Sequence, residues 1–263
     1  MQKLTAIITG ASQGLGKSFA IELASRNIDL VLVSLPDPAL APLAAYLSGN
    51  FGVRVTSVLL DLCDSAQCAA LFGDLRRQGI VADILINNAA IGNLDRFADK
   101  CTAFYKKQIE LNTISPVLLT HLFLSQVREN NASYVLNVGS LGGTFIVPMK
   151  QVYGATKSFI SYFTRCLQVE MAAGNTRFCL LTPGGINTRP ELLVQNGRLK
   201  GIARATILEP ERVARAAVSG MFNGKKEVVP GMLNRALLWL DKLLPPAIRN
   251  NIIRQKMLGA KSH

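Results

Sequence analysis

Tyr153 and Lys157 are the two residues whose types and spacing most directly suggest acid–base chemistry. Because they are four residues apart, they lie on one face of a helix. An ammonium group beside a phenol favours the phenolate, so Lys157 should lower the pKa of Tyr153 from its usual value of about 10. The pair predicts that Tyr153 is a general acid–base for a carbonyl or an alcohol. A surface contact between the two side chains is the simpler alternative.

Ser140 follows the apolar run at 134–138, which has the character of a buried strand. The carboxyl ends of parallel strands meet the ligand crevice of an open α/β sheet. The Ser140 hydroxyl is therefore placed to hydrogen-bond a substrate oxygen on which negative charge develops. A serine after a strand is also a common cap, so it is the combination with Tyr153 and Lys157 that favours a catalytic role.

Gly10, Gly14 and Gly16 lie between a strand-like run near the start of the chain and an amphipathic helix. Glycines allow a tight turn and a close approach of the backbone to a phosphate, and the helix N-terminus adds free N–H groups. The arrangement predicts a loop that binds the phosphates of a nucleotide.

Gly16, Lys17 and Ser18 also resemble the end of the P-loop of nucleotide triphosphatases. A P-loop has four residues between its first glycine and the Gly-Lys pair, whereas Gly10 leaves five. This mismatch in register disfavours a triphosphatase.

The elements that must position these residues follow from an alternation of apolar strand-like runs and helix-length segments. This is the pattern of βαβ units, in which helices cover both faces of a parallel sheet. Pro116 predicts a kink or a displaced turn near Asn112. We expect helices at 15–26, 65–78, 101–128, 151–173 and 210–222, then one or two near the C-terminus. We expect strands at Leu4–Thr9, Ile28–Ser34, Val53–Leu60, Ile84–Asn87, Tyr134–Val138, Arg177–Leu181 and Glu227–Val229.

No linker or repeat divides the chain, so we expect residues 1–263 to form a single α/β domain. The segment 187–208 has no clean period and lies between a predicted strand and a predicted helix. Such a segment in an α/β domain is commonly a mobile cover over a site, and a short helix pair within the core is the alternative.

The composition is that of a globular protein. Hydrophobic residues make up 49% of the 263 residues and charged residues 17%, which excludes a disordered chain. No apolar run reaches the roughly 18 residues of a membrane span, and no signal-peptide pattern is present. Five cysteines without metal-ligand spacing favour reduced thiols in a cytoplasmic protein, with Cys166 and Cys179 buried. With two histidines, one of them terminal, no metal site is expected.

The net charge is +12, and the excess is greatest from Asn196 onward, where 13 basic residues stand against 4 acidic ones. Such a region attracts nucleic acid, anionic lipid or an anionic ligand, or it is simply a solvated basic surface. A nucleic-acid binder is disfavoured because the chain has no recognition motif and few aromatic candidates.

Several motifs together resemble the short-chain dehydrogenase/reductase family, in that family's order and intervals. They are TGASQGLG at 9–16, NNAA at 87–90, Asn112, Ser140, YGATK at 153–157, and PGGINT at 183–188. The resemblance covers about residues 4–230. It implies a Rossmann-type three-layer fold with a seven-stranded parallel sheet in the order 3-2-1-4-5-6-7, helices on both faces, and hydride transfer with NAD(H) or NADP(H).

The resemblance implies a role for each matching residue. Tyr153 would protonate the alkoxide in reduction and remove the proton in oxidation, and Lys157 would lower its pKa and hold the nicotinamide ribose. Ser140 would polarise the substrate oxygen, and Asn112 would hold a water between Lys157 and solvent. The implied cofactor-binding residues are Gly10, Ser12, Gln13, Gly14, Leu15 and Gly16 at the pyrophosphate, Asp61 and Leu62 at the adenine, Asn88 and Ala89 along the adenosine, and Pro183, Gly184, Ile186 and Thr188 towards the nicotinamide, together with Tyr153 and Lys157.

The sequence departs from the family pattern near the cofactor. Ala90 replaces a glycine, which adds a methyl group and should shift the backbone slightly. Leu35 stands where an acid would hold the ribose 2′-hydroxyl of NAD or an arginine the 2′-phosphate of NADP. Because no acid repels a phosphate there and Ser34 offers a donor, we expect NADP(H) to be favoured over NAD(H).

The chain continues beyond the family's last strand as a basic helical extension at 231–263 that contains Trp239. This extension and the segment after Tyr153 are similar to the branch of 17β-hydroxysteroid dehydrogenases and 3-oxoacyl reductases, which implies a bulky apolar ketone or its alcohol. We expect the extension to close the substrate cleft or to contact another subunit. A weak peripheral contact with an anionic membrane is the alternative, through Arg235, Lys242, Arg249, Arg254 and Lys256.

The substrate pocket is expected to draw on 91–97, 141–149 and 187–208, and a highly charged substrate is not expected. Family members usually pair through the helices that hold Asn112 and Tyr153, which implies a homodimer or homotetramer. A nucleotide-binding regulator without turnover is the alternative to an enzyme, and the four filled catalytic positions argue against it. The predicted apolar lining consists of Leu141, Phe145, Ile146, Val147 and Met149.

Overall fold

The computed structural model describes residues 3–128, 131–188, 190–197 and 201–243. Its strands are β1 (Thr5–Thr9), β2 (Asp29–Ser34), β3 (Val55–Leu59), β4 (Ile84–Asn87), β5 (Ser133–Val138), β6 (Thr176–Leu181) and β7 (Glu227–Val228). Its α-helices are α1 (Gly14–Ala24), α2 (Leu40–Phe51), α3 (Ser65–Arg77), α4 (Thr102–Ile109), α5 (Ser115–Leu124), α6 (Gln151–Glu170), α7 (Pro190–Gly197), α8 (Gly201–Ala205), α9 (Pro210–Phe222) and α10 (Met232–Leu243).

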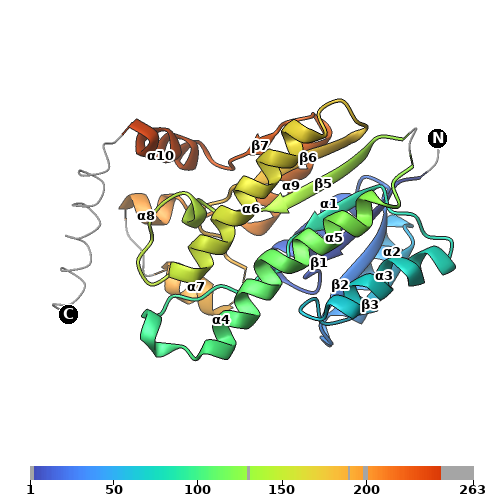
Figure 1. Cartoon of the computed structure of the whole chain (residues 1–263), viewed down its shortest axis with the longest axis horizontal. Helices are drawn as coiled ribbons and strands as arrows, with labels where there is room; N and C mark the ends of the chain where they lie inside the picture. Colours follow the sequence, from blue (N-terminus) through green and yellow to red (C-terminus); the bar gives the residue numbers. More distant parts are fainter. Residues whose placement is uncertain (1–2, 129–130, 189, 198–200, 244–263) are drawn as a thin grey trace.

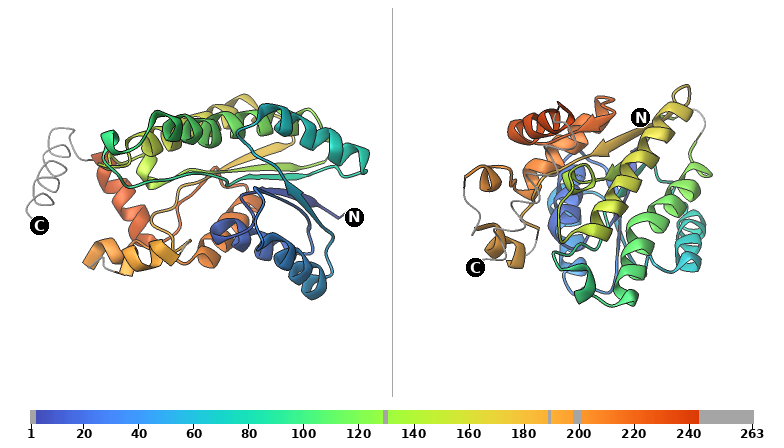
Figure 2. Two further views of the ribbon diagram at one scale, coloured as in Figure 1. Left: turned by 90° about the horizontal axis from the view of Figure 1, so that it is seen from below. Right: turned by 60° about the vertical axis from the view of Figure 1, so that its left-hand side comes forward.

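The strands form one parallel sheet in the order β3-β2-β1-β4-β5-β6-β7. This confirms the predicted Rossmann-type fold and its strand order. Helices α1, α2 and α9 lie on one side of the sheet and α3 to α6 on the other (Figures 1 and 2). The connections that follow β1 and β4 leave in opposite directions, so a crevice opens at the carboxyl ends of these neighbouring strands.

The sheet separates two hydrophobic cores, because alternate residues of a strand point to opposite faces. On β1, Ile8 packs with the helices α1 and α9, while its neighbour Ile7 packs with α3 and α5. Val31 and Leu32 on β2 divide in the same way. Burial on both faces explains why the strands are almost continuously apolar in sequence.

The break between α4 and α5 was predicted, whereas helix α2 was not. The break in the predicted helix 101–128 is confirmed: α4 and α5 are joined by a π-helical turn, η2 (Glu110–Ile114), which contains Asn112 and ends just before Pro116. Helix α2 was missed, because Pro42 and Gly49 have low helix propensity. The burial of Leu40, Leu43 and Leu47 against the core outweighs that propensity.

Candidate active site

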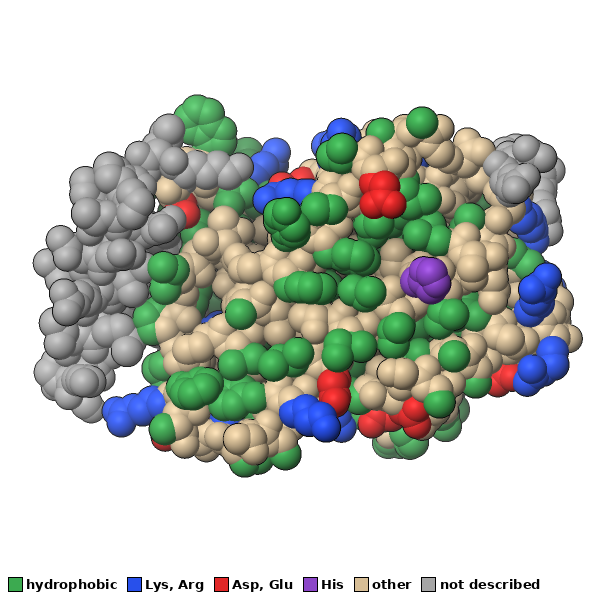
Figure 3. Space-filling model, viewed as in Figure 1, with side chains coloured by type: hydrophobic (Ala, Val, Ile, Leu, Met, Phe, Trp, Pro, Cys, Tyr) green, Lys and Arg blue, Asp and Glu red, His purple; other side chains and the backbone are tan. Residues whose placement is uncertain are grey.

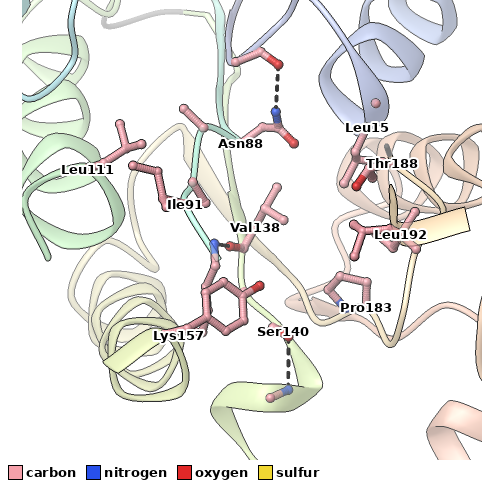
Figure 4. A pocket seen from close by; sticks show the side chains of 18 of the residues that line it. Leu15, Asn88, Ile91, Leu111, Val138, Ser140, Lys157, Pro183, Thr188 and Leu192 are labelled. Carbon is pink, nitrogen blue, oxygen red and sulfur yellow. Dashed lines mark hydrogen bonds between the residues drawn. The ribbon is translucent and has the colours of Figure 1, made fainter. Parts of the chain in front are cut away.

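A cavity of about 1130 Å³ lies at the carboxyl ends of the strands. Its walls come from the glycine loop (residues 10–16) after β1, from the residues that follow β2 to β6, and from α6, α7 and α10. Figure 4 shows Ser140, Lys157 and Val138 on one side of this space and Leu15, Thr188 and Leu192 on the other. The fold thus brings together motifs that are far apart in the sequence.

The glycine loop has a backbone that only glycine accommodates well. Gly10 and Gly14 have φ angles of 64° and 55°, in the left-handed region. A Cβ atom on Gly16 would collide with the carbonyl oxygen of Gly10, and one on Gly14 would lie 2.9 Å from Thr188. The loop is therefore tightly folded at the start of α1, as a phosphate-binding turn requires.

Asn88 locks the glycine loop to the end of β4. Its Nδ2 atom donates to the carbonyl oxygens of Thr9 at 2.9 Å and Gly10 at 3.2 Å. In return, the Thr9 hydroxyl accepts the backbone N–H groups of Asn88 and Ala89 at 2.9 and 3.0 Å. These bonds join the two strands on either side of the crevice and hold its floor in place.

Tyr153 and Ser140 meet inside the cavity. Ser140 caps the short helix Leu141–Gly143 by accepting the N–H of Gly142 at 3.0 Å, and its side chain also hydrogen-bonds the Tyr153 phenol. A Cβ atom on Gly92 would lie 3.3 Å from the tyrosine ring, so the ring is closely flanked by backbone. Burial raises the pKa of Tyr153, and the Ser140 hydrogen bond lowers it by a smaller amount.

Lys157 is buried behind the phenol and does not reach its oxygen. Its Nζ atom donates to the carbonyl oxygen of Val138 at 2.7 Å and lies 5.8 Å from the centroid of the Tyr153 ring. Burial lowers the pKa of Lys157 to about 8. The prediction that Lys157 lowers the pKa of Tyr153 is wrong for this state, because desolvation of the phenol dominates and the ammonium is turned towards Val138.

Asn112 supports the site from behind instead of lining the cavity. Its Oδ1 atom accepts the N–H of Ile91 at 2.9 Å, and its Nδ2 atom donates to the Ile91 carbonyl at 2.9 Å and to the Thr156 hydroxyl at 3.1 Å. The Thr156 hydroxyl in turn donates to the carbonyl oxygen of Tyr153 at 2.7 Å. Asn112 therefore ties the π-helical turn to the first turns of α6. Its water-holding role stays a prediction.

Most of the predicted cofactor and catalytic residues line this cavity; Gly16 and Asn112 do not. The predicted apolar lining needs correction, because Ile146 is 55% exposed and neither Ile146 nor Met149 lines the cavity. Of the range 91–97, only Ile91 contributes. The residues predicted individually that line it are Gly10, Ser12, Gln13, Gly14, Leu15, Ser34, Asp61, Leu62, Asn88, Ala89, Ser140, Leu141, Phe145, Val147, Tyr153, Lys157, Pro183, Gly184, Ile186 and Thr188, and the predicted ranges 141–149 and 187–208 add Gly142, Leu192, Asn196 and Thr206.

Sequence reasoning missed four polar residues of the cavity: Asp37, Lys107, Lys150 and Asn234. Hydrogen bonds from the Ser12 hydroxyl and the Ala39 N–H hold the pKa of Asp37 below its usual value. An acid three residues after a predicted strand was a usable signal. Lys150 carried a signal too, as a lysine just before the helix that holds Tyr153.

Asn234 is 1% exposed and gives no comparable signal in the sequence. Its Nδ2 atom donates to the carbonyl oxygens of Thr206 at 3.1 Å and Pro230 at 3.0 Å, and a Cβ atom on Gly184 would lie within 3.0 Å of the amide. Asn234 thus joins the start of α10 to the loops around the PGGINT turn at 183–188.

The residues present fit a nicotinamide dinucleotide. Added Cβ atoms would fill or distort the glycine loop, so its backbone stays free of side chains there. Such a bare backbone is what allows close contact with a pyrophosphate. The cavity extends from this loop to Ser140 and Tyr153 without interruption. Among the described residues, no group of three or more His, Cys, Asp or Glu side chains is arranged to hold a metal ion. No described helix has the length and apolar character of a membrane span.

Comparison with known sequences points to one family. The profile of the short chain dehydrogenase family matches residues 4–198. Dehydrogenase/reductase SDR family member 7B of Mus musculus is 28% identical over 191 residues, which are 72% of this chain and 59% of that protein. Very-long-chain 3-oxoacyl-CoA reductase of Anas platyrhynchos is 25% identical over an alignment of 262 residues that covers 94% of this chain and 78% of that protein. The chain thus spans less than two thirds of the mouse protein. The second relative confirms the predicted likeness to the 3-oxoacyl reductase branch.

Solved structures agree with this result. A short-chain dehydrogenase from Sphingobium yanoikuyae in complex with NADPH has a TM-score of 0.77 and 26% identity, covering 98% of this chain and 95% of that one. A short chain dehydrogenase/reductase from Burkholderia phymatum in complex with NAD has a TM-score of 0.80, 23% identity and coverage of 91% and 92%, which shows a shared fold. The chain belongs to the short chain dehydrogenase family, and the proteins similar to it include a 3-oxoacyl-CoA reductase and short-chain dehydrogenases whose structures contain NADPH or NAD.

Proposed function

We propose that this protein is an NAD(P)(H)-dependent oxidoreductase that interconverts a ketone and a secondary alcohol on an apolar substrate, with Tyr153 as the acid–base. The observation that carries the proposal is the convergence of Ser140, Tyr153 and Lys157 in the cavity that also contains the glycine loop. A phenol with a hydrogen-bonded hydroxyl beside it is suited to a carbonyl oxygen that gains negative charge.

When bound, the nicotinamide supplies or accepts the hydride. Ser140 donates a hydrogen bond to the substrate oxygen and orients it beside the Tyr153 phenol. Because burial raises the pKa of Tyr153, the phenol carries its proton near neutral pH. In reduction Tyr153 transfers this proton to the alkoxide, and in oxidation the phenolate takes it back. Lys157 stabilises the resulting phenolate once its ammonium leaves the Val138 carbonyl.

An apolar substrate is supported by the side chains around the reacting groups. Phe145, Val147 and Leu237 line the cavity together with Leu192 from α7. We propose that residues 1–263 act as one domain in which the segment 187–208 covers the substrate, since Thr188, Leu192, Asn196 and Thr206 all line the cavity. Most of the proposed C-terminal extension at 231–263 lies outside the described residues; its helix α10 contributes Asn234 and Leu237 to the same wall.

The preferred cofactor is proposed to be NADP(H). Leu35, which lines the cavity where an acid would select NAD, offers no repulsion to a 2′-phosphate. The Ser34 hydroxyl donates to the Leu35 carbonyl at 2.7 Å, so it would have to rotate to meet that phosphate. The charge of Asp37 is engaged by Ser12 and Ala39. Equal turnover with NADH and NADPH at the same low concentration would contradict this preference.

A homodimer is proposed through α4, α5 and α6. Figure 3 shows hydrophobic side chains gathered over the face that these helices form. Tyr162 and Val169 on α6 are 75% and 76% exposed, and Cys166 between them is exposed, which corrects the prediction that it is buried. Apolar groups that face solvent on one surface are typical of a subunit contact. The exposed apolar residues of the face are Ile109, Ile114, Phe159, Tyr162 and Val169.

A cytoplasmic location is proposed because all five cysteines are free thiols, which a reducing compartment maintains. A weak contact of the C-terminal helices with an anionic membrane also stays a proposal. Its support is that α10 exposes Met232, Trp239 and Leu240 to solvent. Arg249, Arg254 and Lys256, which would face lipid headgroups, lie outside the described residues.

The function is tested by following the oxidation of NADPH with a panel of ketones, from small aliphatic to bulky aromatic and steroid ketones. The enzyme proposal expects turnover of at least one bulky apolar ketone. The alternative, a nucleotide-binding regulator, expects NADPH to bind with no turnover of any ketone or alcohol. Binding is measured separately by the change in NADPH fluorescence, so the two outcomes are distinguished.

A further inference from the structure

Lys150 places a second ammonium group beside the Tyr153 ring. It precedes α6 as its N-cap residue and lines the cavity. Its Nζ atom lies 5.6 Å from the centroid of the tyrosine ring, compared with 5.8 Å for Lys157. Lys157 is bound to the Val138 carbonyl, whereas Lys150 has no ion pair with a carboxylate among the described residues.

The backbone at Lys150 is held on both sides. Its N–H donates to the carbonyl of Val147 at 3.2 Å, and its own carbonyl accepts the N–H of Gly154 at 2.7 Å. Met149, directly before it, has a φ of 66°, which is strained for a residue with a side chain. The carbonyl of Met149 accepts the N–H of Asp95 at 3.0 Å, which fixes this strained turn. The fold therefore maintains an unfavourable backbone conformation directly before Lys150.

The charge of Lys150 is unfavourable where it stands. The N-terminus of a helix carries partial positive charge, which repels a cation and attracts an anion. Burial also lowers the pKa of Lys150. A lysine that local electrostatics and burial both oppose is expected where function requires it. An anion beside Lys150 would remove this penalty and would also be favoured by the N-terminus of α6.

The carboxylates of the cavity cannot fill this role, because they lie elsewhere along the sheet. Asp37 and Asp61 follow β2 and β3, which stand at one edge. Lys150 stands with Ser140 and Tyr153, which follow β5, three strands from β2. The part of the cavity that would hold the substrate thus contains two lysines and no described carboxylate. The cofactor phosphates are expected at the glycine loop after β1, so they do not account for Lys150 either.

We propose that Lys150 is a specificity-determining residue that binds an anionic group of the substrate, so that the preferred substrate is an amphipathic keto acid. This inference rests on the proposed function and deepens it. The apolar side chains of the cavity would hold the hydrocarbon body of the substrate, and the Lys150 ammonium would pair with its single carboxylate. The pairing would set which ketone carbon lies at the Tyr153 phenol. A single negative group on an otherwise apolar substrate is compatible with the expectation that the substrate is not highly charged.

The test is a kinetic comparison of oxodecanoic acids, with the ketone at successive positions, and their methyl esters. Each acid and its ester have the same carbon skeleton around the ketone and differ in charge. The wild type should reduce at least one acid with a kcat/KM about 10-fold or more above that of its ester. Lys150→Met should lower this acid-to-ester ratio by about 10- to 100-fold, mainly through the KM of the acid, and Lys150→Arg should retain most of it.

Lys106→Met is the matched control, because Lys106 lies exposed on α4 and outside the cavity. It removes the same charge and should leave the acid-to-ester ratio unchanged. A wild type that prefers the ester at every ketone position would overturn the proposal. A Lys150→Met variant that keeps the wild-type ratio would overturn it as well. In a third outcome, Lys150→Met changes kcat/KM equally for the acid and its ester and shifts the pH profiles of both by the same amount. This would mean that Lys150 acts only on Tyr153, and it would also overturn the proposal.

A binding measurement separates this proposal from the proposed function. Decanoic acid, which has no ketone to reduce, should bind the complex of the protein with NADP⁺ and compete with ketones. Its Kd should increase about 10-fold in Lys150→Met and stay unchanged in Lys106→Met. Binding of decanoic acid through Lys150 without turnover of any ketone would contradict the enzyme function alone. Turnover of neutral ketones with no effect of Lys150 on acid binding would contradict this inference alone.

Discussion

Lys157 donates a hydrogen bond from its Nζ atom to the carbonyl oxygen of Val138 at 2.7 Å. The contact joins the first half of α6 to the last residue of β5, two residues before Ser140. Because the Lys157 side chain is only 4% exposed, its charge is held in a place that disfavours it, and its pKa falls from 10.5 to about 8. This cation therefore lowers the stability of the cofactor-free protein near neutral pH.

Lys157→Met should increase the free energy of unfolding of the cofactor-free protein at neutral pH. The gain has an upper limit of about 3 kcal/mol, set by the change in pKa and reduced by the loss of the Val138 hydrogen bond. Between pH 8 and 10.5 the unfolded wild type binds more protons than the folded one, so its stability should rise and approach that of the variant. Urea unfolding across this range checks the result. The prediction would be contradicted if the difference in free energy of unfolding between the variant and the wild type did not decrease with increasing pH.

Gly16→Ala should strongly weaken cofactor binding, because the added Cβ atom would collide with the carbonyl oxygen of Gly10. We expect the Kd for NADPH, measured by fluorescence, to rise by about 100-fold or more, equivalent to about 3 kcal/mol. Gly49→Ala is the matched control, since a Cβ atom there meets nothing within 4 Å. The control should bind NADPH normally and unfold at a slightly higher temperature. Normal binding by Gly16→Ala would show that the loop does not hold the pyrophosphate.

Asn112→Ala should destabilise the protein by about 2 to 3 kcal/mol, because the partly buried backbone groups of Ile91 and the buried Thr156 hydroxyl lose a hydrogen-bond partner. The comparison variant is Asn50→Ala, which removes an exposed amide that bonds only the Tyr46 carbonyl. It should change stability by less than about 0.5 kcal/mol. Chemical denaturation of both variants measures the difference, and equal effects would mean that Asn112 does not support the site as described.

Tyr162→Asp should weaken the proposed dimer by about 10-fold or more, because a charge replaces a large side chain at the centre of the exposed face on α6. Tyr46→Asp makes the same change on α2, on the opposite side of the sheet, and should not alter the oligomeric state. Sedimentation equilibrium over a range of concentrations reports the dissociation constant. A wild type that stays monomeric at high concentration would exclude this interface.

The sequence contains most of the information on the sheet. Strands such as β2 and β4 are apolar on both faces, so their positions could be predicted from composition alone, while the strand order followed from the family resemblance. Helix α2 could not be predicted with the same ease, because its stability comes from Leu40, Leu43 and Leu47 packing against residues distant in the chain. The position of the break at Asn112 was predictable because proline disrupts a helix locally.

The sequence motifs were sufficient to predict which residues lie at the site. They were not sufficient to predict properties that depend on burial in the folded protein. Ser140, Tyr153 and Lys157 were placed correctly in one cavity, yet the direction of the pKa change of Tyr153 was predicted wrongly. Desolvation depends on the neighbours in space, which spacing along a helix does not reveal. Asn234 was missed for the same reason, since its partners lie in loops that only the folded chain brings together.

The most direct test of the account is the effect of Tyr153→Phe on turnover and on cofactor binding in the same preparation. Removing the phenolic oxygen should lower kcat for ketone reduction by about 10²- to 10⁴-fold. The Kd for NADPH should change by less than about 3-fold, because the glycine loop and its contacts are untouched. Tyr46→Phe, an exposed tyrosine outside the cavity, should retain wild-type turnover. A Tyr153→Phe variant that keeps more than about a tenth of the wild-type kcat would contradict Tyr153 as the acid–base.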